Sequence, residues 1–271
     1  MTLSEYIKEN IAPLSAALPF ADCSVTLGRL IKGYEPTYAV MLVVPYPRSP
    51  GKIASFAKLR DYHIFFKSHE DAVSTLISEK YPGRGARIFS DHSPIDERLA
   101  ACRAGLGVMG DNGLFIAKKY GSYVFLGEIL VTLTAQELIA EGVQICSSDV
   151  GGCLHCGACR DACPSGAIGG DKSLCISALT QKKGDLTDTE RDIIKRGGSA
   201  WGCDVCAEVC PMNRVVTAKD YNPFFLEGAI DPTCRADIDA MSDGDFACHP
   251  FSWRRRDVIG RNFDIIDTGD K

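Results

Sequence analysis

The sequence predicts an α+β protein, in which a layered domain of helices and strands precedes a small cysteine-rich domain. Expected strands and helices alternate through roughly the first 140 residues, which favours an α/β layered arrangement. Eight of the thirteen cysteines then fall between Cys153 and Cys210. A chain of 271 residues is long enough for one large or two modest domains. We divide it into residues 1–145, residues 146–216, and a C-terminal extension, 217–271, that packs back on the core.

Hydrophobic spacing defines the expected elements of the first domain. Residues 3–18 carry apolar side chains at helical intervals, with Pro13 as a kink or a break. Residues 37–44 form a nearly continuous apolar run that ends at Pro45, which is typical of a buried central strand. A long helix is expected over 55–81 and a short strand over 86–90.

The later elements have clearer boundary signals. A helix is expected over 93–103, because Ser93 can cap it, Pro94 suits its first turn, and acidic residues follow. Strands are expected over 113–118 and 122–134. Residues 187–196 should form a helix that begins with a capping box from Thr187 to Glu190. A short helix is expected near 236–241.

The cysteine-rich domain contains two runs with the spacing of iron–sulfur ligands. The first is C-x2-C-x2-C-x3-C-P, which lets three thiolates bind one cluster while the fourth reaches a second cluster. The second is C-x2-C-x3-C-P, and with one isolated cysteine between the runs the chain offers ligands for two [4Fe–4S] clusters. By the ferredoxin crossing rule, one cluster takes Cys153, Cys156, Cys159 and Cys210, and the other takes Cys163, Cys175, Cys203 and Cys206. Each run ends in Cys-Pro, where the proline should stop a helix and turn the chain away.

Two other interpretations of these cysteines are weaker. Structural zinc sites also use C-x2-C pairs, but they usually separate the pairs by a long loop. A disulfide framework is disfavoured by the length of the chain and by an N-terminus that does not resemble a secretory signal. The remaining cysteines share no spacing and are expected to be small buried side chains: Cys23, Cys102, Cys146, Cys234 and Cys248.

Composition narrows the class of protein further. Apolar and charged residues make up 45% and 24% of the chain, as in ordinary globular proteins, and no apolar run is long enough to span a membrane. The formal net charge of −5 argues against a broadly basic nucleic-acid binder. The run Arg254-Arg255-Arg256, with Arg261, is either a local basic patch or a solvated helical face. Free thiols and oxygen-sensitive clusters indicate a reducing cytoplasm.

Two features outside the cysteine runs are candidates for binding or chemistry. Gly105, Gly107 and Gly110 match the dinucleotide fingerprint G-x-G-x-x-G, but they follow a helix and precede a strand, the reverse of the required context. A ligand loop and a bare turn both remain open for this segment. Asp91 lies at the end of an expected strand, and Ser93 already serves as the helix cap. Asp91 is therefore either a solvated loop residue or a proton donor with a pKa raised by burial.

Taken together, these segments resemble the epoxyqueuosine reductase family, which is cobalamin-dependent and carries two [4Fe–4S] clusters. The resemblance covers most of the chain in the same order. The matching stretches are Arg60-Asp-Tyr-His63, Ser90-Asp-His-Ser-Pro-Ile-Asp-Glu-Arg98, Arg103-Ala-Gly-Leu-Gly-Val-Met-Gly-Asp-Asn112, Gly121-Ser-Tyr-Val-Phe-Leu-Gly-Glu-Ile129, both cysteine runs, Cys175-Ile-Ser-Ala-Leu and Arg261-Asn262.

The resemblance implies a nitroreductase-like or reductive-dehalogenase-like domain that binds base-off cobalamin, followed by a ferredoxin-like domain. Electrons would pass from a donor such as ferredoxin or flavodoxin through the two clusters to cobalt, which would reduce epoxyqueuosine in tRNA to queuosine. The family's proton donor falls on Asp91 and its active-site tyrosine on Tyr62. Weaker cofactor-site candidates are His63, Arg98, Gly105, Gly107, Gly110 and Asn112.

The sequence also departs from the family pattern. Asp111 stands where the family has a lysine after the glycine run, which places an anion beside the expected site. The segment before residue 37 is shorter, and the C-terminal helical-repeat domain that helps full-length members hold tRNA has no counterpart. Two alternatives therefore stay open: a corrinoid reductase acting on a small molecule, and a ferredoxin-like electron carrier without a corrinoid.

Overall fold

A computed structural model describes residues 1–214 and 220–268, and its contacts divide the chain into two compact units. The first unit comprises Met1–Tyr46, Tyr62–Leu154 and Val216–Asn222, and the second comprises Pro47–Asp61, His155–Val215 and Pro223–Lys271. The chain crosses between the units several times. The division therefore differs from the three consecutive segments drawn from the sequence, because residues 47–61 and the C-terminal residues group with most of the cysteine-rich segment.

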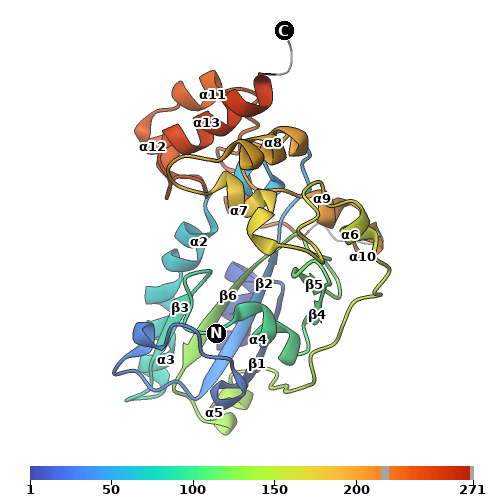
Figure 1. Cartoon of the computed structure of the whole chain (residues 1–271). Coiled ribbons are helices and arrows are strands. Elements are labelled where there is room, and N and C mark those ends of the chain that lie inside the picture. Colours follow the sequence, from blue (N-terminus) through green and yellow to red (C-terminus); the bar gives the residue numbers. More distant parts are fainter. Residues whose placement is uncertain (215–219, 269–271) are drawn as a thin grey trace. The chain divides into compact units, whose positions relative to one another are not determined.

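A four-stranded antiparallel sheet, in the order β1-β2-β6-β3, forms the centre of the first unit (Figure 1). Its strands are β1 (Leu14–Pro19), β2 (Tyr38–Pro45), β3 (Ala86–Phe89) and β6 (Val124–Val131). The expected central strand is confirmed, since β2 is buried along almost its whole length. An apolar run suits this position because helices cover both faces of the sheet.

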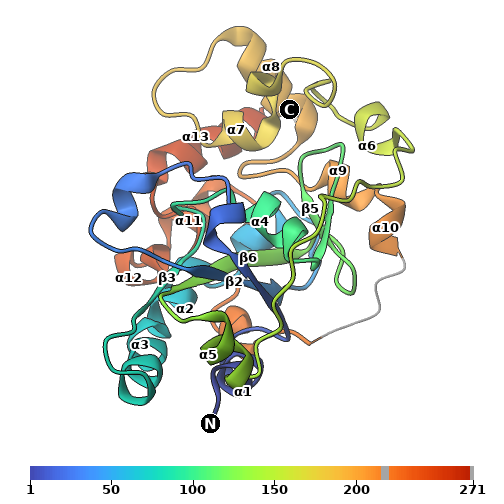
Figure 2. The ribbon, with the colours of Figure 1, turned by 90° about the horizontal axis from the view of Figure 1, so that it is seen from below.

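Helices lie on both faces of this sheet (Figure 2). One face packs on α4 (Glu97–Arg103), and the opposite side carries α1 (Leu3–Tyr6), α2 (Tyr62–Ser68) and α3 (Glu70–Lys80). Gly127 of β6 admits the Phe66 ring of α2, since a Cβ there would lie 2.6 Å from that ring. A small antiparallel pair, β4 (Gly107–Met109) and β5 (Phe115–Ala117), follows α4, and α5 (Ala135–Ala140) follows β6. Short 3-10 helices span Phe20–Asp22 and Gly28–Ile31.

Three expected elements of the N-terminal half are corrected. The helix over 3–18 ends with a π-helical turn at Ile7–Ile11, and the residues after Pro13 form β1 because they pair with β2. The long helix over 55–81 is a 3-10 turn, Ser55–Lys58, followed by the separate helices α2 and α3. The helix expected from Ser93 begins at Glu97 and is capped by Asp96, whose side chain accepts the Leu99 N–H.

The second unit is built from short helices around a compact apolar core. The helices are α6 (Ala158–Asp161), α7 (Ile176–Thr180), α8 (Asp188–Gly197), α9 (Val205–Glu208), α10 (Pro211–Arg214), α11 (Arg235–Asp239), α12 (Asp243–Ala247) and α13 (Arg256–Asp267), with 3-10 turns at Lys172–Leu174 and Pro223–Leu226. The expected capping box at Thr187 and Glu190 starts α8, and the short helix near 236–241 is α11. The helices α12 and α13 were not expected from the sequence.

The core of this unit joins residues that are far apart in sequence. Trp201 is buried with Ile53, Phe251 and Phe263 in one apolar cluster. Buried Asn262 of α13 donates hydrogen bonds to the carbonyls of Thr180 (2.7 Å) and Ala200 (2.9 Å), so that α13 ties the end of α7 to the segment before the second cysteine run. The α+β class is confirmed by this architecture.

Candidate functional site

Seven of the eight expected ligand cysteines lie in the second unit, at the ends of short helices. Cys159 lies in α6 and Cys206 in α9, and these two helices pack against each other. Cys175 directly precedes α7, and Cys210 directly precedes α10. Cys153, by contrast, falls at the end of the first unit, where the Met109 N–H donates to the nearby Gly151 carbonyl. Short helices around turns suit cluster binding because they leave backbone N–H groups beside the thiolates.

Charge effects indicate that three of these thiols lie near one another. The pKa of the Cys203 thiol is raised to about 11, chiefly by burial, and the charges of Cys175 and Cys163 act in the same direction. Burial also acts on Cys163, but hydrogen bonds from the Ile168 N–H and from Ser165 outweigh it and lower the pKa of that thiol. Cys163, Cys175 and Cys203 are three of the four residues assigned above to the second cluster.

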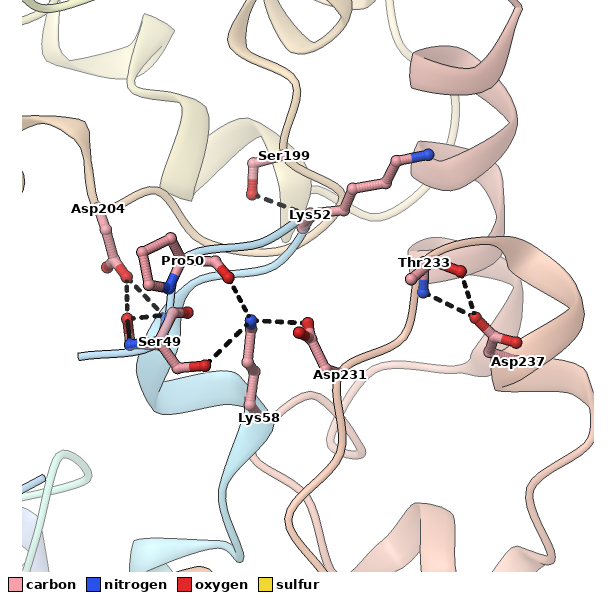
Figure 3. Close-up of polar contacts among 10 residues, drawn as sticks. Ser49, Pro50, Lys52, Lys58, Ser199, Asp204, Asp231, Thr233 and Asp237 are labelled. Carbon is pink, nitrogen blue, oxygen red and sulfur yellow. Dashed lines mark hydrogen bonds and ion pairs between the residues drawn. The ribbon is translucent and has the colours of Figure 1, made fainter. Parts of the chain in front are cut away.

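A network of polar contacts fixes the start of the second cysteine run (Figure 3). Asp204 follows Cys203, and its carboxylate accepts both the N–H (2.7 Å) and the hydroxyl (2.6 Å) of Ser55. Burial raises the pKa of the Asp204 carboxyl, while the Ser55 hydrogen bonds oppose that shift. Gly202 has a left-handed φ of +71°, and a Cβ there would lie 2.6 Å from Ala54 Cβ. The segment 47–61 thus packs closely against this run.

The two Cys-Pro sequences behave differently in the structure. Helix α6 ends at Asp161, and a turn follows in which the Gly166 N–H donates to the Cys163 carbonyl. Helix α9 likewise ends at Glu208, before the second proline, so neither helix continues through its Cys-Pro sequence, as expected. Pro211 then begins the new helix α10, which it can do because a proline at the first helical position loses no internal hydrogen bond.

The second group of candidate residues surrounds Asp91 in the first unit. Asp91 follows β3 and has a left-handed φ of +60°, which is uncommon for a residue other than glycine. Its side chain is 71% exposed, and its carboxylate lies 3.6 Å from Nε2 of His63. The interaction with His63, helped by Tyr62, lowers the pKa of the Asp91 carboxyl. Of the two alternatives for Asp91, a carboxyl pKa raised by burial is therefore not the one seen here.

Aromatic packing positions the two partners of Asp91. Tyr62 begins α2 and stacks between the His63 ring, at 4.1 Å, and the Phe125 ring of β6, at 4.6 Å. An open cavity of about 410 Å³ lies between α2 and β3, and its lining is mostly apolar. His63 and His92 both line it. Titratable groups at the rim of an apolar pocket are a common feature of sites that bind and transform small molecules.

The glycine run has a packing role of its own. A Cβ at Gly107 would lie 2.4 Å from the Ile116 carbonyl, and one at Gly110 would lie 2.3 Å from Oδ1 of Asn112. Gly105 has φ +74°, with Cys146 against its open side. Close packing within the β4–β5 hairpin therefore accounts for Gly107, and a left-handed backbone before the hairpin accounts for Gly105. Arg98 donates to the Gly113 carbonyl (2.9 Å) at the tip of this hairpin, and Asn112 accepts the Leu114 N–H.

The sequence analysis did not single out two acidic residues that contact the loop 90–96, between β3 and α4. This loop carries Asp91 and is called the Asp91 loop below. Glu97, the first residue of α4, accepts the Asp91 N–H at 2.9 Å, and Glu128 of β6 is completely buried. Glu128 carried a usable signal, because it is the one charged side chain in the apolar run that forms β6. Buried acids are rare unless they are paired or functional.

The arginine run is largely engaged in local contacts. Arg254 stacks on exposed Trp253, with the guanidinium carbon 3.6 Å from the ring centroid. Arg256 donates to the carbonyls of Ile238 and Ser242, and Arg261 donates to those of Gly184 and Lys182. These contacts hold the C-terminal helices together, which favours a structural role for Arg256 and Arg261.

Comparisons with known proteins agree with this geometry. Residues 152–213 match a family described as a 4Fe-4S double cluster binding domain. Epoxyqueuosine reductase of Staphylococcus aureus is 32% identical over 215 residues, which cover 75% of this chain and 53% of that protein. The Synechocystis enzyme of that name is 34% identical over 191 residues, covering 67% and 62%. The chain thus spans about half the length of the curated relatives it matches.

Solved structures extend the similarity to almost the whole fold. Epoxyqueuosine reductase from Streptococcus thermophilus has a TM-score of 0.74 at 24% identity, over 97% of this chain and 79% of that one. An epoxyqueuosine reductase solved with an epoxyqueuosine-modified tRNA stem loop has a TM-score of 0.75, also at 24% identity and with the same coverage.

The fold and the cysteine pattern define an iron–sulfur protein in which a layered α+β unit accompanies a double [4Fe–4S] domain. Within that class, the chain belongs to the epoxyqueuosine reductase family. Among the residues that the structure describes, no helix is long and apolar enough to cross a membrane.

Proposed function

We propose that this protein is an iron–sulfur and cobalamin-dependent reductase that converts epoxyqueuosine in tRNA to queuosine. The observation that carries the proposal is the presence, in one chain, of a double-cluster domain and the Asp91–His63–Tyr62 group. A cluster domain alone would suit an electron carrier. A carboxylate, an imidazole and a phenol beside an open pocket are the groups that a proton-coupled reduction needs.

The eight cysteines are the proposed ligands, shared between the two clusters as assigned from the spacing. The charges of Cys175 and Cys163, which help to raise the pKa of the Cys203 thiol, support the placement of the three residues around one cluster. The packing of α6 on α9 supports the exchange of ligands between the two runs. Reducing electrons would come from a ferredoxin or flavodoxin.

Removal of the epoxide oxygen as water consumes two electrons and two protons, and the clusters can supply only the electrons. We assign the delivery of a proton to Asp91, with His63 as the group that reloads it. The low pKa of the Asp91 carboxyl makes Asp91 alone a poor acid at neutral pH. An imidazolium 3.6 Å away can hold the proton until the carboxylate passes it to the substrate. Tyr62 would orient both groups through its contacts with them.

The residues around the cavity beside Asp91 fit one edge of a corrinoid. The cavity beside Asp91 is apolar, and its volume of about 410 Å³ suits a small ligand or one edge of a larger planar one. His63 and His92 would line that edge. When bound, cobalamin would supply a redox-active metal centre that the clusters could reduce. The glycine hairpin with Arg98 and Asn112 would form a rigid wall rather than a flexible binding loop.

The substrate assignment rests on the relatives. One related reductase has been solved with an epoxyqueuosine-modified tRNA stem loop, and another from Bacillus subtilis has been solved with its catalytic loop swung out of the active site. The corresponding loop here would be the one that carries Asp91.

Anaerobic reconstitution with iron, sulfide and cobalamin, followed by metal analysis, tests the cofactors. We expect about eight irons and one cobalt per chain and a base-off cobalamin spectrum. The reconstituted protein should then convert an epoxyqueuosine-modified stem loop when given dithionite, and Asp91→Ala should abolish turnover while it retains iron and cobalt. Lys8→Ala, at an exposed position far along the chain from the site, is the matched control.

Two outcomes would replace the proposal. Eight irons without bound cobalt would favour an electron carrier. A full complement of both metals, with no salt-dependent binding of the stem loop, would favour a corrinoid reductase that acts on a small molecule.

A further inference from the structure

Two buried carboxyl groups meet directly beneath the Asp91 loop. Glu128 lies on the α4 side of β6, opposite Phe89 at the end of β3, and its side chain has no exposed surface. Glu97 lies at the first position of α4, and its Oε1 atom is also buried. The two carboxyl groups lie next to each other: each acts on the pKa of the other, and both contact the same loop, Glu97 at the Asp91 N–H and Glu128 at the Ser93 hydroxyl.

Every carboxyl oxygen of this pair has a hydrogen-bond partner only if one of the two carboxyl groups is protonated. Oε2 of Glu97 accepts the Asp91 N–H, and Oε1 of Glu128 accepts the Ser93 hydroxyl. The two remaining oxygens, Oε1 of Glu97 and Oε2 of Glu128, find no donor among the described residues. A single proton between them satisfies both atoms at once, because one carboxyl group then donates to the other. Two adjacent buried carboxylates repel each other, which disfavours the ionisation of both.

The pKa values of both carboxyl groups are raised. Burial, followed by the neighbouring Glu128 charge, holds the pKa of the Glu97 carboxyl well above its usual range. Burial likewise raises the pKa of Glu128 to about 7. The other titratable groups that face the pair are Asp91 and the Cys23 thiol, whose pKa is raised to about 12 chiefly by burial. None of these groups brings a positive charge that would stabilise a second carboxylate.

The pair is attached to the Asp91 loop at two points. The first is the Asp91 N–H itself, which points to Glu97 while the residue occupies its left-handed conformation. The second is Ser93, whose hydroxyl donates to Glu128 and accepts the Ile95 N–H at 3.0 Å. Left-handed backbone at a residue other than glycine persists only where its surroundings hold it in place.

We propose that Glu97 and Glu128 share one proton and together act as a latch that holds the Asp91 loop in the conformation seen here. Both are positioning residues, since Glu97 contacts the Asp91 backbone N–H and Glu128 contacts the Ser93 hydroxyl, not the reacting groups. The latch rests on the proposed function only for its importance to turnover. The shared proton and the hydrogen bonds that hold the loop do not depend on any substrate.

The first test looks for the proton by infrared difference spectroscopy of the cluster-loaded protein. A buried carboxylic acid gives a C=O band that shifts in D2O. We expect this band in the native protein above neutral pH and its loss in Glu97→Gln. Glu79→Gln, at an exposed position on α3, is the control and should leave the band unchanged. Absence of the band from the native protein would overturn the shared proton.

The second test measures hydrogen exchange at the Asp91 amide. Glu97→Gln keeps an acceptor for this N–H and a donor toward Glu128, so exchange should stay near the native rate. Glu97→Leu removes both, and exchange should accelerate about tenfold or more, as expected for the loss of a hydrogen bond to a carboxyl group. Equal exchange rates in the two variants would show that Glu97 does not hold the loop.

Turnover then separates the latch from the proposed function. With the modified stem loop as substrate, Glu97→Leu should lower kcat at least about tenfold, and Glu97→Gln should restore it. If neither the native protein nor any variant turns the substrate over, the proposed function fails, while the infrared and exchange results still decide the latch. If Glu97→Leu accelerates exchange without lowering kcat, the latch exists but does not position Asp91 for catalysis.

Discussion

Replacing Asp231 by alanine should destabilise the second unit by about 2 kcal/mol, because it leaves a buried lysine without its counter-ion. Lys58 is 2% exposed, and its ammonium lies 2.6 Å from the Asp231 carboxylate (Figure 3). It also donates to the Pro50 carbonyl (2.9 Å) and the Ser49 hydroxyl (3.3 Å). Gly51 makes room for this arrangement, since a Cβ there would lie 2.4 Å from the ammonium nitrogen.

The magnitude follows from the unequal burial of the two partners. Removing one partner of a fully buried ion pair costs about 3–5 kcal/mol. Asp231 is 59% exposed, so water already screens part of the attraction, and the Pro50 carbonyl still accepts one hydrogen bond after the substitution. We therefore place the cost nearer to 2 kcal/mol. Lys58→Met removes the buried charge together with its need for a partner and should cost about 1 kcal/mol or less.

Urea unfolding of the cluster-loaded protein under anaerobic conditions measures these differences, with fluorescence of buried Trp201 and cluster absorbance as two signals. Asp267→Ala is the matched control. It breaks the Lys52–Asp267 pair of the same 2.6 Å length, in which both partners are partly exposed, and should cost at most about 1 kcal/mol. The reasoning fails if Asp231→Ala destabilises no more than Asp267→Ala, or less than Lys58→Met.

Three further predictions concern the two units separately. Burial raises the folded-state pKa of Glu128 from 4.5 to about 7, so the free energy of unfolding should fall by up to about 3 kcal/mol as pH rises through that window. Glu128→Gln should flatten this fall, and an unchanged slope would contradict the raised pKa. Asn262→Ala removes two buried hydrogen bonds and should cost about 2–4 kcal/mol in urea unfolding, whereas exposed Asn10→Ala should be close to neutral. Cys175→Ala should leave about four irons per chain by metal analysis, and retention of about eight would remove Cys175 from the ligand set; Cys234→Ala, outside both runs, should keep all of them.

The sequence predicted best where a pattern acts locally. The central strand β2 is a nearly continuous apolar run, and both of its faces are covered. The capping box of α8 needs only Thr187 and Glu190, three residues apart, and both of its hydrogen bonds form. Ligand spacing in the cysteine runs is equally local, and the double-cluster family matches the same segment.

Prediction failed where distant partners decide a local outcome. Ser93 has the right residue type and place for a helix cap, but its hydroxyl donates to Glu128, thirty-five residues away in the chain. Asp96 therefore caps α4 instead. The long helix over 55–81 breaks for a similar reason, since the backbone N–H groups of Arg60 and Asp61 donate to carbonyls of distant residues, Phe225 and Cys248. Periodicity cannot detect a competing hydrogen bond from another segment.

The pKa of Asp91 illustrates the same limit in the chemistry. An acid at the exit of a strand can be buried with a raised pKa or exposed with a lowered one, and the two cases imply opposite protonation states. The position of His63 decides between them, and it depends on the start of α2 and on the stacking of Tyr62 against Phe125. The buried acid with a raised pKa does exist, but it is Glu128, on the strand that pairs with β3. A lone acid in an apolar central strand therefore deserves the scrutiny that is usually given to acids in loops, because its burial forces it to share a proton or find a partner.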